Sequence, residues 1–226
     1  ALPIESQLQA DLANHLNAEI VLGTVSNIRE ATQWLKYTYL YLRMLKNPMT
    51  YGIDGDLMRF DRHLVSEREG LIKAAAKILS ESRMAMFDED SGTLTATDLG
   101  RIASHYYIHY ETVQNINKLI NPRMTEVDIL YLICSSKEFE NVKVRDDEID
   151  ELHGLMNDAP VSVKGGLENT AGKVNVLLQS YISHRNLKSF SLISDCSYVV
   201  QSLGRIVRAL FEIAMKRSWS LLVDKL

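Results

Sequence analysis

The chain has 226 residues, of which 46% are hydrophobic and 24% are charged, and its formal net charge is −4. These values are ordinary for a soluble globular protein and exclude an intrinsically disordered chain. Because the high pI of a free-standing nucleic-acid binder is missing, any nucleic-acid surface has to be local. No signal peptide opens the sequence, and no apolar run is long enough to cross a bilayer. Since the chain begins with Ala rather than Met, and LPIESQ resembles the middle of a longer chain, we expect an excised segment.

The two cysteines, Cys134 and Cys196, lie far apart in apolar helical patterns. Cysteines in such positions usually behave as small buried hydrophobic residues. We therefore expect free thiols in a reducing compartment and regard a disulfide as the less favoured alternative.

The first half of the chain begins with a polar helical stretch and a boundary at Gly23. Ser26 or Asn27 is placed to cap the next helix, and Glu30 stands at capping-box spacing from Asn27. We predict one aromatic-rich helix over about residues 28–45, which Asn47-Pro48 ends. We expect neighbouring elements to bury the wide apolar surface of this helix on two sides.

A further helix is expected from near Leu57 or Asp61 to about Ser80. Residues 84–87 and 93–96 are short β-compatible segments around Asp-Glu-Asp-Ser-Gly, which is a hairpin signal. Thr97-Asp98 then caps a helix that continues through Tyr106. The order helix, helix, hairpin, helix is that of a winged helix.

Beyond Tyr107 the pattern is wholly helical, so the predicted fold class is mainly α: a winged helix followed by an all-α helical bundle with one long helix. Asp146, Asp147 and Glu148 suit the positive end of a helix dipole, which is a purely structural role. The expected helices cover about residues 110–120, 125–135, 146–157, 172–183 and 192–219.

The long helix at 192–219 carries a polar stripe and an apolar stripe for about seven turns. Arginines at this spacing can follow a polyanionic strand, since guanidinium groups bind phosphates and planar groups stack on unstacked bases. The alternative is an ordinary surface helix whose polar face meets only water. The polar face includes Ser194, Tyr198, Gln201, Arg205 and Arg208.

No self-contained active site is visible in the sequence. GxxxxGK[ST], GxGxxG, GxSxG and paired CxxC motifs are all absent. His105 and His109 have the i,i+4 spacing of a helical zinc site, but no Glu or Cys completes it. We predict no catalytic residue and no metal ligand. We interpret the acidic clusters, such as Asp88–Asp90, as loop residues whose carboxylates are solvated.

Six segments, in the same order as in one known family, carry a resemblance that covers essentially the whole chain. They are LPIESQL, LNAEIVLGTVSN, WLKYTYLYLRMLKNPMTYGI, TDLGRIASHYYI, KVNVLLQSYIS and SFSLISDCSYVVQSLGRIVRALFEIAMKRSW. The chain resembles the Ski-two-like RNA helicases of superfamily two, of the type with two cassettes. The resemblance implies that residues 1–22 end a RecA-like domain, 23–107 form the winged helix and 108–226 begin the Sec63-like helical region.

By this resemblance the long helix is the ratchet helix, which contacts the strand that the motor pulls from its three-prime side. Ser194, Tyr198, Gln201, Arg205 and Arg208 would then face single-stranded RNA, with DNA left open. Arg101 is a further candidate, for nucleic acid or for an acidic neighbour. ATP and Mg²⁺ would bind in RecA-like domains of the parent protein, so no cofactor is expected in this segment.

The resemblance also implies partners: the RecA-like domains and second cassette of the same chain, and subunits of a larger ribonucleoprotein or ribosome-associated complex. It implies an intracellular location, in the cytoplasm or the nucleus, without a membrane. The aromatic first helix favours a winged helix that braces neighbouring domains over one that reads a duplex groove. An alternative function is a protein-docking platform from a weakly active cassette.

Overall fold

The computed structural model describes residues 4–54 and 56–226. It divides into two compact units, of which the first ends at Ser104 and the second begins at His105. Each unit has its own buried core, so each is described by itself.

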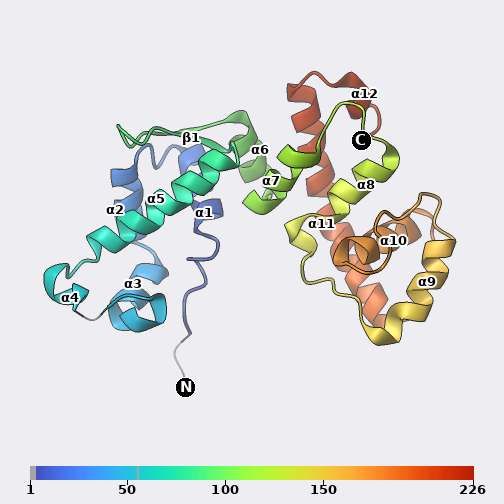
Figure 1. The fold of residues 1–226 in the computed structure, drawn as a ribbon, viewed down its shortest axis with the longest axis horizontal. Helices are drawn as coiled ribbons and strands as arrows, with labels where there is room; N and C mark the ends of the chain where they lie inside the picture. Colours follow the sequence, from blue (N-terminus) through green and yellow to red (C-terminus); the bar gives the residue numbers. More distant parts are fainter. Residues whose placement is uncertain (1–3, 55) are drawn as a thin grey trace. The chain divides into compact units, whose positions relative to one another are not determined.

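The first unit is built mainly from helices with a small hairpin (Figure 1). Its longest helix, α5, packs against α1, α2 and β1. Its elements are α1 (Leu12–Leu22), α2 (Ile28–Leu35), α3 (Tyr39–Lys46), the 3-10 turn η1 (Pro48–Tyr51), α4 (Leu57–Phe60), α5 (Val65–Glu81), β1 (Ala85–Phe87), β2 (Leu94–Ala96) and α6 (Asp98–Tyr106).

The hairpin pairs β1 and β2 antiparallel, with Met86 opposite Thr95. An isolated bridge joins Asn27 to Thr93, so the segment before α2 pairs with the edge of this two-stranded wing. Asn27 also caps α2, because its side chain accepts a hydrogen bond from the Glu30 amide. Helices on a small wing with this order make the unit a winged helix, as predicted.

The single helix expected over residues 28–45 is wrong, because the structure breaks it into α2 and α3. Thr38 has an extended backbone (φ −93°, ψ 156°), and its hydroxyl donates to the Leu35 carbonyl at 2.7 Å. The same hydroxyl caps α3 by accepting from the Tyr41 amide at 3.4 Å. A threonine that satisfies both helix ends competes with a continuous helix, which periodicity alone does not reveal.

The same break leaves the aromatic side chains only partly covered within the unit. Tyr37 is 81% exposed and Tyr39 is 51% exposed, whereas Tyr41 is buried. The N-terminal stretch lies against α3, since Arg43 forms two hydrogen bonds with the Glu5 carboxylate, at 3.0 and 2.6 Å. Residues from Glu5 onward therefore pack within the winged-helix unit.

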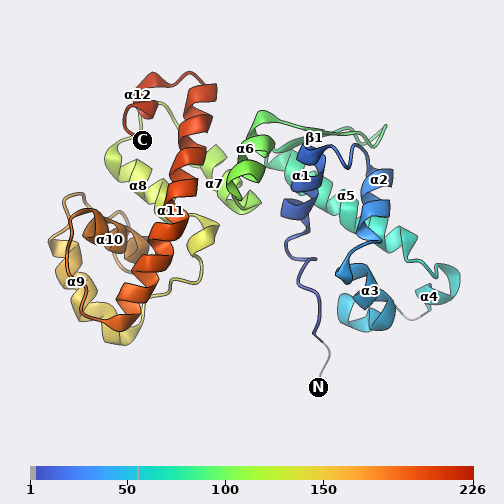
Figure 2. The ribbon, with the colours of Figure 1, turned by 180° about the vertical axis from the view of Figure 1, so that it is seen from behind.

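The second unit is all α in its described residues, in agreement with the predicted helical bundle (Figure 2). Its core helix is α10, in which every residue from Gly172 to Ser180 is buried between α8, α9 and α11. Its elements are α7 (Tyr110–Leu119), α8 (Glu126–Cys134), η2 (Lys137–Phe139), η3 (Asp146–Glu148), α9 (Ile149–Asn157), α10 (Thr170–Ile182), α11 (Phe190–Lys216) and α12 (Ser220–Val223).

Both cysteines are free and buried, as expected, and burial raises the pKa of the Cys134 thiol to about 12. Across residues 4–54 and 56–226, no helix combines the length and the apolar character that crossing a membrane requires.

Candidate nucleic-acid interface

The long helix α11 runs without a break from Phe190 to Lys216, so it is 27 residues and about 40 Å long. It contains no Pro, and Gly204 does not interrupt it. One stripe packs against α8, α10 and α12, and the opposite side is left to solvent. The buried stripe consists of Leu192, Cys196, Val199, Ser202, Ile206, Ala209, Leu210, Ile213 and Ala214.

Four of the five predicted α11 residues are exposed on the outer side of this helix: Ser194, Tyr198, Gln201 and Arg208. Gly204 lies on the same side, and a Cβ atom added there would meet nothing within 4 Å. A glycine in the middle of a helix costs about 1 kcal/mol relative to alanine. Since no packing neighbour within the described chain requires it, the α11 backbone is open to close approach at this position.

Two of the five predicted residues, Tyr198 and Arg205, lie along one edge of this face and also form hydrogen bonds within the unit. The Tyr198 hydroxyl donates to the Glu138 carbonyl at 2.7 Å. Arg205 is half-buried, and its guanidinium donates to the Tyr107 carbonyl at 2.8 Å and to Ser202 Oγ at 3.4 Å. A guanidinium has five N–H donors, so Arg205 keeps donors for a phosphate.

Sequence reasoning missed Tyr107, which belongs to the edge formed by Arg205. Its side chain is 81% exposed and its backbone is left-handed, with φ at 54°. An exposed aromatic ring beside an arginine is a suitable surface for base stacking. The signal was present in the sequence as TDLGRIASHYY, but only the turn after α6 brings Tyr107 next to α11.

Arg208 stands beside a second contact, in which the Tyr106 hydroxyl donates to Glu212 Oε1 at 2.6 Å. This hydrogen bond raises the pKa of Tyr106, and the nearby Arg208 charge opposes the shift. Within the second unit, this contact ties Tyr106 to the C-terminal half of α11 without using the Arg208 guanidinium.

Large apolar side chains are also exposed on the outer side of α11. Phe190 is 85% exposed, Met215 is 55% exposed, and Ile193 and Phe211 are 44% and 40% exposed. The polar stripe predicted from the sequence is therefore flanked by apolar groups that the helical bundle does not cover.

The start of α11 is held by a buried ion-pair cluster that sequence reasoning missed. Lys173 and Glu148, both with fully buried side chains, form an ion pair at 2.5 Å. Lys173 also pairs with Asp195 of α11 at 2.7 Å, and Arg145 pairs with both carboxylates. The dipole role predicted for Glu148 is therefore incomplete, because its charge lies inside the bundle.

These contacts set the charge state of Glu148. Burial alone would raise the pKa of its carboxyl group, whereas hydrogen bonds from Lys173, Ser191 and Arg145 lower the pKa to about 2. The carboxylate is thus ionised throughout the physiological range, and α10, η3 and α11 share one charged cluster.

Arg101, the sixth predicted residue, is exposed on α6 but belongs to the first unit. It is therefore treated as a separate candidate from the five α11 residues.

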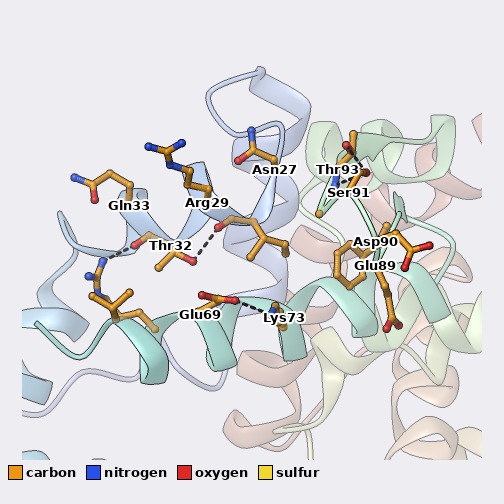
Figure 3. Close-up of a pocket in the computed structure, with 15 residues that line it drawn as sticks. Asn27, Arg29, Thr32, Gln33, Glu69, Lys73, Glu89, Asp90, Ser91 and Thr93 are labelled. Carbon is orange, nitrogen blue, oxygen red and sulfur yellow. Dashed lines mark hydrogen bonds and ion pairs between the residues drawn. The ribbon is translucent and has the colours of Figure 1, made fainter. Parts of the chain in front are cut away.

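One cleft of the winged helix has mixed charge. It measures about 700 Å³ and lies between α2, α5 and the hairpin (Figure 3). Arg29 and Lys73 line it together with Glu69, Glu89 and Asp90, and Glu69 neutralises Lys73 in an ion pair at 2.6 Å. The balanced charge of this cleft lacks the basic stripe that tracks phosphates.

The two histidines at i,i+4 spacing belong to different helices. His105 lies in α6 and His109 caps α7, because the chain turns at Tyr107. Among the residues that the structure describes, no group of three His, Cys, Asp or Glu side chains is arranged to hold a metal ion.

Comparisons with known proteins agree with this architecture. Residues 96–226 match the Sec63 Brl domain, and residues 5–89 match a Winged Helix-turn-helix domain. Over 225 residues the chain is 50% identical to the chicken (Gallus gallus) Activating signal cointegrator 1 complex subunit 3 and 48% identical to the human protein of that name. It is also 45% identical, over 224 residues, to the human U5 small nuclear ribonucleoprotein 200 kDa helicase.

These alignments cover 99% of this chain but only 10% of each relative, so the chain spans about a tenth of the proteins it matches. Both kinds of relative are found, and the identities of 50% and 48% to the signal-cointegrator proteins are higher than the 45% to the U5 helicase. Because the Sec63 model matches more than half of the 226 residues, the chain belongs to the Sec63 Brl domain family, and here that domain follows a winged helix.

Proposed function

We propose that this chain is a non-catalytic part of an ATP-dependent 3′–5′ RNA helicase, in which the exposed face of α11 guides the translocating single strand. The observation that carries the proposal is the unbroken 27-residue helix that leaves Ser194, Gln201 and Arg208 exposed along one side. Two relatives are named as helicases, the human U5 protein and an Arabidopsis thaliana DExH-box ATP-dependent RNA helicase that is 49% identical.

The domain roles follow from the same proposal. Residues 1–22 lead out of a preceding RecA-like domain and, from Glu5 onward, pack on the winged helix of residues 23–107, which braces the motor. Residues 108–226 begin the Sec63-like region. ATP and Mg²⁺ bind elsewhere in the full-length protein, since the sequence lacks a phosphate-binding loop. RecA-like domains, a second cassette and subunits of a ribonucleoprotein assembly are the partners that this role requires.

Arg208 gives the cleanest test, because Arg205 also holds the Tyr107 carbonyl and its replacement would disturb the fold. In the full-length protein, Arg208→Gln should weaken binding to single-stranded RNA and slow unwinding, while nucleotide binding is unchanged. For every phosphate that the variant no longer neutralises, the slope of log affinity against log salt should fall by about 0.7. The control is Arg123→Gln, which removes the same charge from an exposed loop. Unchanged unwinding and an unchanged salt slope in Arg208→Gln would show that α11 does not guide the strand.

A protein-docking platform is the second candidate, and the exposed apolar side chains of α11 favour it. Phe211 and Met215 lie near Arg208 on the same helix and are 40% and 55% exposed. If this face docks a protein, Phe211→Ser with Met215→Ser should release a subunit from the purified complex and leave unwinding intact. Under the strand-guiding proposal, the same double variant keeps the complex together.

A further inference from the structure

A hollow of about 600 Å³ lies beside the N-terminal half of α11, where α10 ends and the chain turns back. Tyr181 and His184 contribute planar side chains to its wall, and Ile193 and Val200 of α11 contribute an apolar wall. Tyr181 is 53% exposed and Ile193 is 44% exposed, so these groups are available to a ligand. Such a volume falls within the range of small-molecule sites.

Backbone hydrogen bonds fix the turn beside the hollow. The Arg185 amide donates to the Ser180 carbonyl at 2.8 Å, and the His184 amide donates to the Tyr181 carbonyl at 3.1 Å. These bonds close the end of α10 with His184 in a left-handed conformation, at φ 52°. Glycine is the residue that suits this position best, so the imidazole side chain is kept there at a conformational cost.

The chemistry of the lining matches an uncharged heteroaromatic ring that is attached to an anionic backbone. Planar and apolar groups suit the faces of such a ring, and polar groups suit its edge. Ser197 Oγ donates to the Ile193 carbonyl at 3.0 Å, which leaves the oxygen able to accept from a ring N–H. Arg185 also lines the hollow and forms an exposed ion pair with Asp158 at 3.8 Å, and the described residues that line the hollow include no carboxylate.

Ser197 of α11 lines the hollow and is also exposed on this helix. On a helical wheel Ser197, Gln201 and Arg208 lie within about 40° of one another, so a strand lying on this face passes the mouth of the hollow. Ser197 and Arg208 are separated by about 16 Å along the axis, which makes contacts at the two places separable by mutation.

We infer that this hollow accepts one unstacked base of the RNA strand, held by stacking on Tyr181 and His184. The inference rests on the proposed strand-guiding role of α11 and adds a base-binding position to it. A strand held at one base advances in discrete steps, whereas a face that contacts only phosphates allows continuous sliding.

The test measures how tightly the full-length protein binds a series of single-stranded RNAs, each of which lacks the base at one different position. We expect one position at which the missing base weakens binding about 5-fold or more, as the removal of one base–aromatic stack does. In Tyr181→Ala the intact RNA should bind as weakly as the abasic RNA binds to the original protein, and removal of that base should have no further effect. Tyr181→Phe keeps the ring and should behave like the original protein.

A second variant, His184→Gly, removes the imidazole without backbone strain, because glycine adopts the left-handed conformation freely. Ultraviolet crosslinking of RNA with 4-thiouridine at the sensitive position should label Tyr181 or His184, and His184→Gly should reduce the yield. If no single missing base weakens RNA binding, or if the sensitive position persists in Tyr181→Ala, the base-binding inference is wrong. Arg208→Gln still tests strand guiding in either case. Release of a bound protein instead of RNA by Tyr181→Ala would also overturn it.

Discussion

The ammonium group of Lys173 lies 2.7 Å from the Asp195 carboxylate and thereby joins the core helix α10 to the first turns of α11. Its other two donors go to Glu148 at 2.5 Å and to the Lys143 carbonyl at 2.9 Å. A buried lysine is tolerated only when its charge and its donors are satisfied, and here all three are. The cluster fixes where α11 begins, and through it the position of the exposed face.

Lys173→Met should destabilise the second unit by about 3–5 kcal/mol, because the substitution removes the buried cation and leaves the buried Glu148 carboxylate with only the half-exposed Arg145 as a partner. Urea unfolding in a Trp34→Phe background measures this, since Trp219 is then the only tryptophan. The matched control is Lys164→Met, whose ion pair with Asp128 is exposed and should contribute less than about 1 kcal/mol. Equal effects from the two substitutions would contradict a stabilising role for the buried cluster.

The second unit should lose stability in acid as Glu148 is protonated. The pKa of Glu148 is about 2 in the folded protein and near its ordinary value of 4.5 when unfolded. Its contribution is therefore complete above about pH 4.5 and is lost as the pH falls toward 2. Unfolding free energies followed by Trp219 fluorescence between pH 6 and 2 should show this decline, and Glu148→Gln should flatten it. A parallel decline in both proteins would assign the acid sensitivity to other groups.

Two glycines of the first unit should respond to alanine in opposite directions. A Cβ atom at Gly100 would lie 2.0 Å from the Met84 carbonyl oxygen and 2.9 Å from Asn17 Oδ1. Gly100→Ala should therefore cost about 1–3 kcal/mol or more through overpacking. Gly70 lies in α5 with nothing within 4 Å, so Gly70→Ala should add up to about 1 kcal/mol. Trp34 fluorescence in a Trp219→Phe background measures both, and destabilisation by Gly70→Ala would show that α5 has an unseen neighbour.

Gly204→Ala separates stability from function in α11. The position is open, so alanine should raise the stability of the second unit by about 1 kcal/mol. If an RNA strand approaches the helix backbone there, the added methyl group should weaken RNA binding by the full-length protein despite the gain in stability. A variant that is more stable and binds RNA normally would exclude close contact at Gly204.

The sequence by itself determined the fold class and the arrangement of its parts along the chain. Apolar periodicity, the hairpin signal around Asp88–Asp90 and the capping residues Asn27 and Thr97 predict elements that the structure contains. These signals are local, because they depend on neighbours within a few turns of one helix or strand. The amphipathic pattern of α11 likewise identified Ser194, Gln201 and Arg208 as exposed, because the helical spacing of the apolar residues places them on the opposite, buried side.

The tertiary structure alone decided which polar side chains are exposed and which are engaged. Tyr198 and Arg205 bond to carbonyls of Glu138 and Tyr107, which are 60 and 98 residues away in the chain. Lys173 and Glu148 look like surface charges in the sequence, yet they form a buried pair. Such pairings depend on how helices distant in sequence pack together, and a charged residue has the same local pattern whether its partner is water or a carboxylate.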